Sequence, residues 1–297
     1  MQEPSYYIET PHRTIAAYSS AQSSNIDRQT VEAFGNEWLS FHHFSDKDLQ
    51  DIFRHYFDIV TPDMLNDQKT AIDLGCGSGR FIKALLPRVK HIVGLDPSKA
   101  VLAADQLIGQ SDKVTLIQAD IDNIPFPDDY FDFAYSLGVL HHIPDTRLAL
   151  QRCVQKLKKN GYFLLYLYYN LDNRPLPYRL LFAASNLLRR IVCQLPPTPK
   201  RYVCDLLAIL LYMPFVGLCR LLKKIGVPTA LRQRIPLYFY EDKSWYIIRN
   251  DSLDRFGTPL EQRFSRQHIE TMMNYAGLTD IVFSEQTPYW HAVGRKL

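Results

Sequence analysis

A glycine-rich turn separates an apolar run from a helical pattern near residue 75. Residues 73–80 read DLGCGSGR, and the short apolar run that starts at Ala71 leads into them. Glycines in such a turn let the backbone approach a ligand without a Cβ clash and adopt positive φ angles. The helix that follows points free N–H groups at the same place. The pattern therefore predicts a site for a nucleotide-like ligand.

Two residues of this turn argue against a dinucleotide. In the fingerprint G-x-G-x-x-G, read from Gly75, the third glycine would fall at position 80, where the chain has Arg80. Asp73 is a poor neighbour for a pyrophosphate, but it suits a ligand that carries a positive ammonium and a sulfonium. A nicotinamide-dependent oxidoreductase on a related fold is therefore disfavoured.

Strands and helices alternate around the turn, and they must position it. Short apolar or β-branched runs predict strands at 71–74, 91–95, 114–118, 131–136 and 162–168. Amphipathic or capped runs predict helices at 80–87, 99–109 and 145–158. The alternation breaks after residue 170 and resumes with a helix at 265–275 and strands at 280–284 and 290–295. Such alternation indicates βαβ units and a mostly parallel sheet.

We therefore predict one α/β domain that is interrupted by an insertion. The expected parts are an N-terminal arm and helical cap (1–66), an α/β core (67–170), a basic and partly apolar insertion that serves as a substrate lid (171–264), and a C-terminal helix with strands that complete the core (265–297). The polar residues 1–25 are expected to form a mobile arm. Phe34 and Trp38 lie at helical spacing and are expected to cover the ligand.

Acidic residues recur where the predicted strands end. Asp96 follows the second strand and is itself followed by Pro97, and Asp120 follows the third strand and precedes Ile121. Ligands of open α/β sheets bind at the carboxyl ends of the strands. The order of these residues and the spacing D-x-G-x-G-x-G resemble the class I methyltransferases that use S-adenosylmethionine (SAM).

The resemblance implies a role for each position. Asp96 would grip both ribose hydroxyls, Pro97 would pack on the adenine face, and Asp120 would accept from the exocyclic amine. The residues implied in cofactor binding are Asp73, Gly75, Cys76, Gly77, Gly79, Asp96, Pro97, Asp120, Ile121, Ser136 and Leu137. Ordinary structural roles are the alternative: glycine turns are common in α/β folds, Asp96 could cap the helix after it, and Asp120 could cap a turn.

A second motif lies after the fourth strand, where residues 140–145 read LHHIPD. Together with the core, over about 70–165, it resembles the type 11 group of small-molecule methyltransferases, similar to those of quinone biosynthesis. The resemblance implies a Rossmann-like sheet of seven strands, the first five parallel and the last antiparallel. His141 or His142 would lie close to the methyl group and could serve as a general base. Alternatively, one of them caps or packs under the following helix.

The acceptor is less constrained by the sequence. Enzymes that methylate the amine of DNA adenine or glutamine carry an Asn/Asp-Pro-Pro-aromatic run after the fourth strand, whereas this chain has SLGV at 136–139. We therefore favour an oxygen acceptor on a small or lipid-linked molecule. Candidate acceptor-binding residues are Tyr238, Tyr240, Trp245, Asp254, Arg255 and Arg263, although Arg255 and Glu261 could instead form a structural ion pair.

The insertion carries an uneven charge. Residues 174–249 contain thirteen Lys and Arg against three acids, a net charge of +10 in a chain whose total is +3. Residues 206–219 are uncharged and apolar, but this run is shorter than the roughly 20 residues that cross a bilayer. Three interpretations stay open: peripheral membrane contact through 176–225, a lid for a phosphorylated or nucleic-acid acceptor, or an ordinary hairpin with solvated Lys and Arg.

The five cysteines show no zinc-like C-x-x-C spacing, and the first residues lack the features of a secretory signal, so we expect free thiols, no metal and a cytoplasmic location, with membrane association left open. The favoured hypothesis is a SAM-dependent methyltransferase. A non-catalytic SAM-binding module is the first alternative, and a methyltransferase of RNA or protein is the second, although nucleic acid is disfavoured because no known nucleic-acid module is visible. The oligomeric state is left open.

Overall fold

Strands and helices alternate through residues 70–166 of the computed structural model, as their sequence pattern predicts. The structure describes residues 3–18, 23–40, 44–173 and 175–297. The chain forms two compact units, of which the first comprises Met1–Asn173 with Leu260–Leu297 and the second comprises Arg174–Pro259. The second unit falls within the predicted insertion 171–264.

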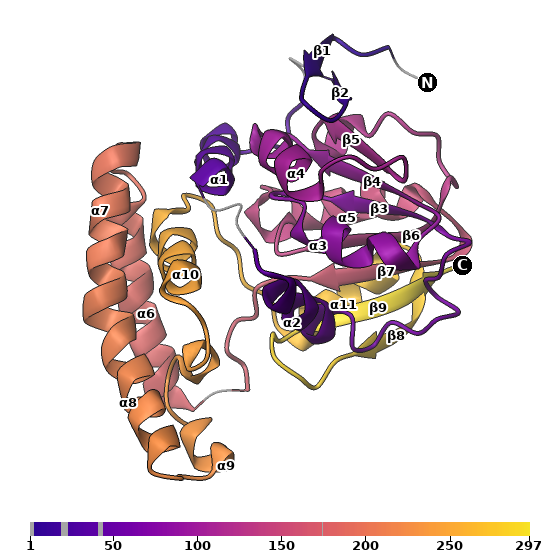
Figure 1. Ribbon diagram of the computed structural model, residues 1–297. Helices are drawn as coiled ribbons and strands as arrows, with labels where there is room; N and C mark the ends of the chain where they lie inside the picture. Colours follow the sequence, from indigo (N-terminus) through magenta and orange to yellow (C-terminus); the bar gives the residue numbers. More distant parts are fainter. Residues whose placement is uncertain (1–2, 19–22, 41–43, 174) are drawn as a thin grey trace. The chain divides into compact units, whose positions relative to one another are not determined.

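The first unit is built on one sheet, which has nine strands within the described residues (Figure 1). Their order is β1-β2-β5-β4-β3-β6-β7-β9-β8. The strands are β1 (Tyr6–Glu9), β2 (Thr14–Ala17), β3 (Thr70–Leu74), β4 (His91–Asp96), β5 (Val114–Gln118), β6 (Phe131–Leu137), β7 (Leu157–Tyr166), β8 (Leu278–Phe283) and β9 (His291–Lys296). Strands β3 to β7 are parallel, and β9 runs antiparallel between β7 and β8. The prediction of a mostly parallel α/β sheet is confirmed.

The predicted number of seven strands is wrong, because the N-terminal segment adds two. β1 and β2 form an antiparallel hairpin, and β2 extends the sheet in parallel with β5. The prediction of a mobile arm over 1–25 is therefore wrong for residues 3–18, while 1–2 and 19–22 lie outside the described residues. The overlooked signal is two short aromatic or β-branched runs, YYI and TIA, on either side of a turn at Pro11.

A buried ion pair holds this hairpin on the sheet. The guanidinium of Arg13 lies 2.7 Å from the Asp105 carboxylate, and the two side chains are only 10% and 1% exposed. Arg13 also donates to the carbonyl oxygens of Gly109 and Val114. Because Gly109 follows the last turn of a helix, the cation also meets the negative end of that helix dipole.

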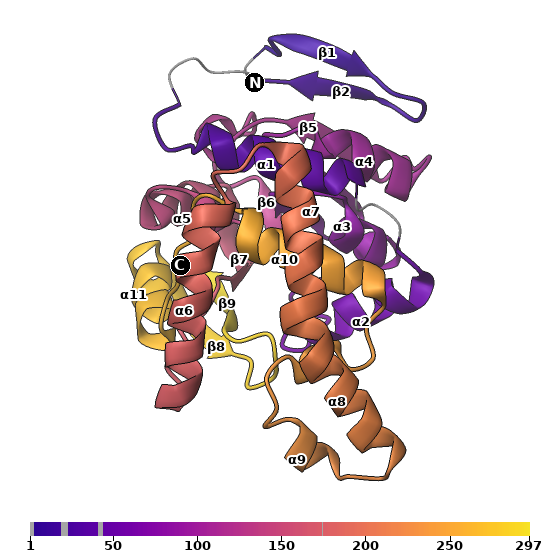
Figure 2. The same cartoon turned by 90° about the vertical axis from the view of Figure 1, so that its left-hand side faces the viewer.

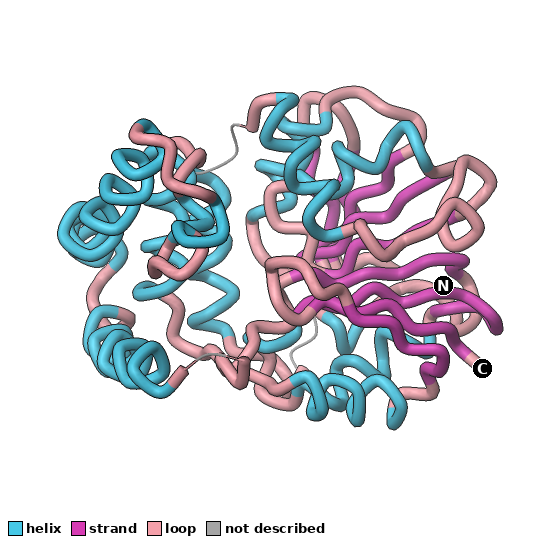
Figure 3. Tube along the Cα trace, turned by 90° about the horizontal axis from the view of Figure 1, so that it is seen from below, coloured by secondary structure: helices cyan, strands magenta, loops and turns pink. Residues whose placement is uncertain are grey.

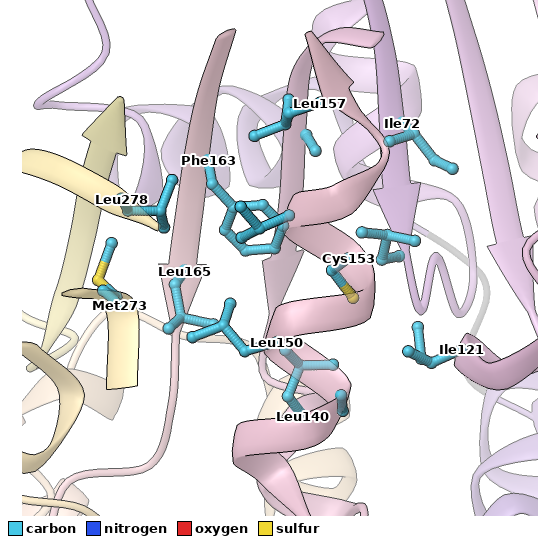
Figure 4. Close-up of a cluster of buried hydrophobic side chains, with 14 of the residues drawn as sticks. Ile72, Ile121, Leu140, Leu150, Cys153, Leu157, Phe163, Leu165, Met273 and Leu278 are labelled. Atoms are coloured by element: carbon cyan, nitrogen blue, oxygen red, sulfur yellow. The ribbon is translucent and has the colours of Figure 1, made fainter. Parts of the chain in front are cut away.

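Helices cover both faces of the sheet (Figure 3). They are α1 (Arg28–Ser40), α2 (Asp46–Tyr56), α3 (Arg80–Leu85), α4 (Ala100–Ile108), α5 (Thr146–Gln155) and α11 (Arg266–Tyr275), with the 3-10 turns η1 (Leu86–Arg88), η2 (Ile121–Asn123) and η3 (Leu140–His142). Side chains alternate between the two faces of each strand. Ala71 packs with the α3 and α4 side, while Ile72 packs with α5 and α11. Figure 4 shows the second of these clusters, in which Cys153 and Phe163 are fully buried.

The second unit is entirely helical within the described residues. It contains α6 (Leu176–Val192), α7 (Pro197–Leu207), a π-turn η4 (Ala208–Tyr212), α8 (Met213–Lys224), α9 (Thr229–Arg232), η5 (Tyr238–Tyr240) and α10 (Trp245–Gly257). Pro196 lies between α6 and α7, and α7 begins at Pro197. Helix α10 was not predicted, because its apolar residues follow no clean helical period. It nevertheless places Ile248 and Phe256 in a small core with Cys204, Ala208 and Val216.

Candidate active site

The three predicted carboxylates lie at one edge of the sheet. Asp73 is next to the end of β3 and pairs in register with Gly94 of β4, and Asp96 ends β4 beside Gln118 of β5. The N–H of Ala119, the residue before Asp120, donates to the Asp96 carbonyl. The strand order reverses between β3 and β6, and ligands of doubly wound sheets bind at such a switch point. The edge therefore has the place and the charge of a ligand site.

Asp73 is a buried carboxylate that forms no ion pair with the residues that the structure describes. Its side chain is 1% exposed, and neither oxygen has a hydrogen-bond partner among the described residues. Burial raises the pKa of Asp73 to about 8, and the nearby Tyr135 hydroxyl and the Arg80 charge offset only part of this rise. An unpaired buried carboxylate is costly, so a cationic ligand at this edge would relieve that cost.

The glycine turn has the predicted conformation, and a side chain covers it. Gly75, Gly77 and Gly79 have φ angles of +91°, +51° and +76°. A Cβ on Gly77 would lie 3.0 Å from the indole nitrogen of Trp38, and a Cβ on Gly75 would clash with Val139. The Arg80 guanidinium lies 4.5 Å from the centre of the Trp38 ring. The Trp38 indole therefore lies against the glycine turn.

Asp96 is tied to the turn and to the start of α4. Its Oδ2 accepts from the Gly77 N–H at 2.9 Å, and its Oδ1 accepts from the N–H and hydroxyl of Ser98. Asp96 thus holds the turn before α4 but does not cap that helix, whose N-cap is Lys99. Each carboxylate oxygen can accept two hydrogen bonds, so Oδ2 keeps capacity for one more donor, such as a ribose hydroxyl.

Asp120 caps a turn, which is the structural role considered for it as an alternative to cofactor binding. Its Oδ1 accepts from the Asp122 N–H and the Asn123 amide, and its Oδ2 accepts from the Ser23 hydroxyl at 2.7 Å. A contact with an adenine amine would have to share or replace the bond from Ser23.

Asp120 and Pro97 also line a cavity of about 410 Å³ beside the edge. This size lies within the range of small-ligand sites. The other lining residues come from the ends of β4 and β5, from α1 and from the N-terminal segment: Tyr6, Ala17, Tyr18, Ser23, Ile26, Arg28, Val31, Glu32, Gly35, Asn36, Ser98, Lys99, Gln118 and Ala119. The sequence interpretation missed Tyr6 and Tyr18, because it treated their segment as an arm without structure.

The remaining predicted cofactor residues are buried in structural positions. The Ser136 hydroxyl donates to the Leu74 carbonyl at 2.7 Å and so ties β6 to β3. Leu137 packs with the core on the α3 side, and Ile121 packs on the α5 side. Burial raises the pKa of the Cys76 thiol well above its usual range, with Asp96 and Asp73 adding to the rise, so the thiol stays protonated.

The two histidines lie side by side in η3, with ring centres 4.0 Å apart. His141 is fully buried, and neither of its ring nitrogens has a partner among the described residues. Burial lowers the pKa of His141 well below its usual range, and His142 and Arg263 add to this effect, so the ring is neutral. The centre of the His141 ring lies 3.9 Å from the centre of the Tyr168 ring.

His142 has a defined tautomer. Its Nδ1 lies 2.6 Å from the carbonyl oxygen of Leu260. Because a carbonyl only accepts, Nδ1 carries the proton, and the neutral ring has its lone pair on Nε2. Neither histidine caps the next helix, since the N-cap of α5 is Asp145, which accepts from the Leu148 N–H. Both rings are buried, and they contact each other and Tyr168, while His142 also contacts Phe34.

Arg263 brings a positive charge to this group. It pairs with Glu261 at 2.9 Å, and the Glu261 side chain is only 2% exposed. Its guanidinium also lies 5.0 Å from the centre of the Tyr168 ring. Arg263 thus belongs to the histidine cluster of the first unit, and sequence spacing alone would not have identified Tyr168 as its neighbour.

The other acceptor candidates belong to the second unit and have partners there. Tyr240 packs against Tyr212, and Arg255 stacks on Phe182 and donates to Ser185. Trp245 begins α10 and is 41% exposed. Arg255 lies ten residues further along the same helix, about 15 Å away along its axis.

Tyr238 and Tyr240 belong to the separate turn η5, and the Asp254 backbone carbonyl accepts from the Thr258 hydroxyl. Tyr240, Asp254 and Arg255 lie close to the buried Asp251, which accepts a hydrogen bond from Tyr240, whereas Trp245 lies at the other end of α10. The role of the candidates in acceptor binding stays a prediction. Among the described residues, no group of three or more His, Cys, Asp or Glu could hold a metal ion.

Comparisons with known proteins agree with this picture of the first unit. Residues 72–165 match the family model described as "Methyltransferase domain". The chain is 32% identical over 97 residues to the uncharacterized methyltransferase YcgJ of Bacillus subtilis (strain 168), a match that covers 32% of this chain and 38% of that protein. It is 40% identical over 104 residues to the tRNA U34 carboxymethyltransferase of Shewanella sediminis (strain HAW-EB3), covering 33% and 31%.

The matched segment therefore spans about a third of the length of these curated relatives. Among solved structures, one match is the structure of human N-acetylserotonin methyltransferase in complex with SAM. The TM-score of that comparison is 0.49 at 16% identity, and it covers 89% of this chain and 56% of that chain.

Proposed function

We propose that this chain transfers the methyl group of SAM to an oxygen of a small or lipid-linked acceptor, because residues 72–165 match a methyltransferase domain. The observation that carries the cofactor assignment is Asp73, a buried carboxylate without a partner among the described residues, at the carboxyl edge of the sheet. The α-ammonium of a methionine moiety is a cation of the right size to pair with it.

The other residues at the edge fit the rest of this cofactor. Asp96 would accept from the ribose through the remaining capacity of its Oδ2, and Pro97 with Asp120 would enclose the base in the cavity of about 410 Å³. When bound, the cofactor supplies an electrophilic methyl group on a sulfonium. The protein then has to orient the acceptor, exclude water and remove the acceptor proton.

His142 is suited to remove that proton. The Leu260 carbonyl holds its Nδ1–H, so Nε2 carries the basic lone pair in a fixed orientation. A hydroxyl acceptor needs such a base, and this supports oxygen over an amine. Arg263 lies beside the same cluster and would attract an acceptor that carries negative charge.

The tRNA-modifying relatives do not decide the acceptor. They match only over about a third of this chain, which is the segment expected to bind the cofactor. Neither transfer to RNA nor a non-catalytic SAM-binding role has a specific contact in its favour. Both remain outcomes of the test.

The first test is cofactor binding. Isothermal titration of the purified chain should show SAM binding and no NAD binding, and Asp96→Ala should abolish the SAM signal. Asp112→Ala removes an exposed carboxylate of the same unit and should bind normally. Normal SAM binding by Asp96→Ala would refute the site assignment.

The second test is turnover. Extracts of cells with and without the gene are compared by untargeted mass spectrometry, and a metabolite that lacks one methyl in the deletion strain is the expected acceptor. The purified enzyme should then produce S-adenosylhomocysteine from SAM and that metabolite. Tight SAM binding with no turnover in any extract fraction would favour the non-catalytic module, and methylated RNA as the product would overturn the small-molecule assignment.

A further inference from the structure

The second unit exposes a long apolar face that its own core does not use. Helices α7 and α8 are joined through η4 into one helix from Pro197 to Lys224. One side of this helix and its C-terminal extension carries large apolar residues that are between 45% and 72% exposed: Tyr202, Leu206, Leu210, Leu218, Leu221 and Ile225. Their spacing of three, four or eight residues places them on one side, over a length of about 35 Å.

Helix α6 adds a second apolar row. Leu176, Leu180, Leu187 and Ile191 are between 62% and 65% exposed. Figure 2 shows α6 beside α7, with α10 passing behind α7, and α10 contacts both α6 and α7. The sides of α6 and α7 that turn away from α10 are therefore left without cover inside this unit. Exposed apolar patches of this extent mark interaction sites rather than ordinary surface.

The charge around these rows favours an anionic partner. Residues 174–259 contain fourteen Lys and Arg against five Asp and Glu. The two charged residues within 203–222 are engaged on the other side of the helix, because Asp205 pairs with Arg249 and Arg220 donates to the carbonyls of Glu241 and Lys243. Exposed basic residues lie at the ends of the rows instead, at Arg190, Arg201 and Lys224.

The same helix is long and apolar enough to cross a membrane, and it is the single helix of that kind in the described part of the chain. Its packing argues against crossing. The Tyr212 hydroxyl donates to Asp251, Ser252 donates to the Cys204 carbonyl, and Arg249 pairs with Asp205 at 2.8 Å. A spanning orientation would bring these α10 groups into hydrocarbon or strip α10 away, and both are costly. An orientation in the plane of the interface keeps them out of the hydrocarbon.

We propose that the apolar rows of α6 and α7–α8 dock on the surface of an anionic lipid bilayer, with the apolar side chains inserted and the terminal Arg and Lys residues at the headgroups. This proposal rests on the second unit alone and does not depend on the assigned activity. An interfacial helix with basic flanks gains both from apolar burial and from attraction to anionic lipids.

The test is flotation of the full chain with unilamellar vesicles. The protein is expected to float with vesicles of phosphatidylcholine that contain 30% phosphatidylglycerol, at about 0.1 M salt. Vesicles of phosphatidylcholine alone, or 0.5 M salt, should reduce the bound fraction. Leu210→Glu/Leu221→Glu should lower the partition coefficient at least tenfold. Removing one charge, as in Arg190→Gln or Lys224→Gln, should lower it by about fivefold on anionic vesicles.

The matched control is Leu297→Glu, because Leu297 is 66% exposed at the end of the first unit. It should float like the wild type, and circular dichroism should show that each variant is folded. The proposal is overturned if the wild type does not float with anionic vesicles, or if Leu210→Glu/Leu221→Glu floats equally well. It is also overturned if light scattering finds a stable dimer that this double substitution dissolves, because a second copy would then cover the face.

Discussion

Replacing Asp73 by asparagine is expected to stabilise the cofactor-free protein and to abolish SAM binding. Burial moves the pKa of Asp73 from 3.8 to about 8, so between these values the folded protein binds more protons than the unfolded chain. Stability contributed by this group is therefore present below pH 4 and is lost as pH rises toward 8. Each pKa unit corresponds to about 1.4 kcal/mol, so the cost is roughly 4 kcal/mol at pH 7 and approaches 6 kcal/mol above pH 8.

The measurement is urea unfolding of the wild type and of Asp73→Asn at pH 5, 6, 7, 8 and 9, without cofactor. The difference in unfolding free energy between the two should grow by about 1.4 kcal/mol per pH unit up to pH 8 and then level off. Saturating SAM should stabilise the wild type, by about 2.7 kcal/mol at a hundred times Kd. It should leave the variant unchanged, because asparagine cannot pair with the ammonium.

The control is Asp251→Asn in the second unit. Burial raises the pKa of Asp251 to about 6, so its difference from the wild type should level off near pH 6, and the variant should still bind SAM. If the difference in unfolding free energy between Asp73→Asn and the wild type does not change across pH 5–8, the assigned cost of burying the Asp73 carboxylate is refuted. Wild-type SAM affinity in this variant would refute the assigned counterion role.

Three further predictions concern the cover of the site, its base and the N-terminal hairpin. SAM should change the tryptophan fluorescence of the wild type. Trp38→Phe should still bind SAM in calorimetry but should lose this fluorescence change. If the variant shows the same fluorescence change as the wild type, the Trp38 indole stays in place when SAM binds. His142→Ala should lower kcat by about 10²–10⁴-fold with little change in SAM affinity, and it should remove the acidic limb of the pH–rate profile. If the pH–rate profile of the variant is unaltered, the His142 ring serves only in packing. Arg13→Met should lower the free energy of unfolding in urea by about 3–5 kcal/mol, because it leaves the buried Asp105 carboxylate unpaired. Arg13→Met/Asp105→Leu should recover most of that loss. If both variants lose the same stability, the loss does not come from the broken ion pair.

Local patterns were sufficient to predict most of the first unit. The alternation of strand and helix, the glycine turn and the acid at the end of β4 each depend on a few neighbouring residues. Parallel strands bring their carboxyl ends to one edge of the sheet, independently of the conformation of the connecting loops. The placement of Asp73, Asp96 and Asp120 on adjacent strand ends therefore followed from their positions in the chain.

Weak local signals account for what the sequence interpretation missed. The hairpin β1–β2 has strands of only four residues each, and they lie in a segment that is otherwise polar. Helix α10 has no regular apolar period because it packs against α6 and α7. In both cases the element owes its existence to a surface that distant residues supply.

By itself, the sequence determined the fold class, the nucleotide-like turn and the order of acidic residues, because those depend on short-range patterns and on the geometry of parallel sheets. Only the tertiary structure decided which groups are paired. It left Asp73 without a counterion among the described residues, placed the Trp38 indole over Gly77, and fixed the His142 tautomer through Leu260, 118 residues away. Such contacts join segments far apart in the chain, and no local pattern encodes a partner that only packing selects.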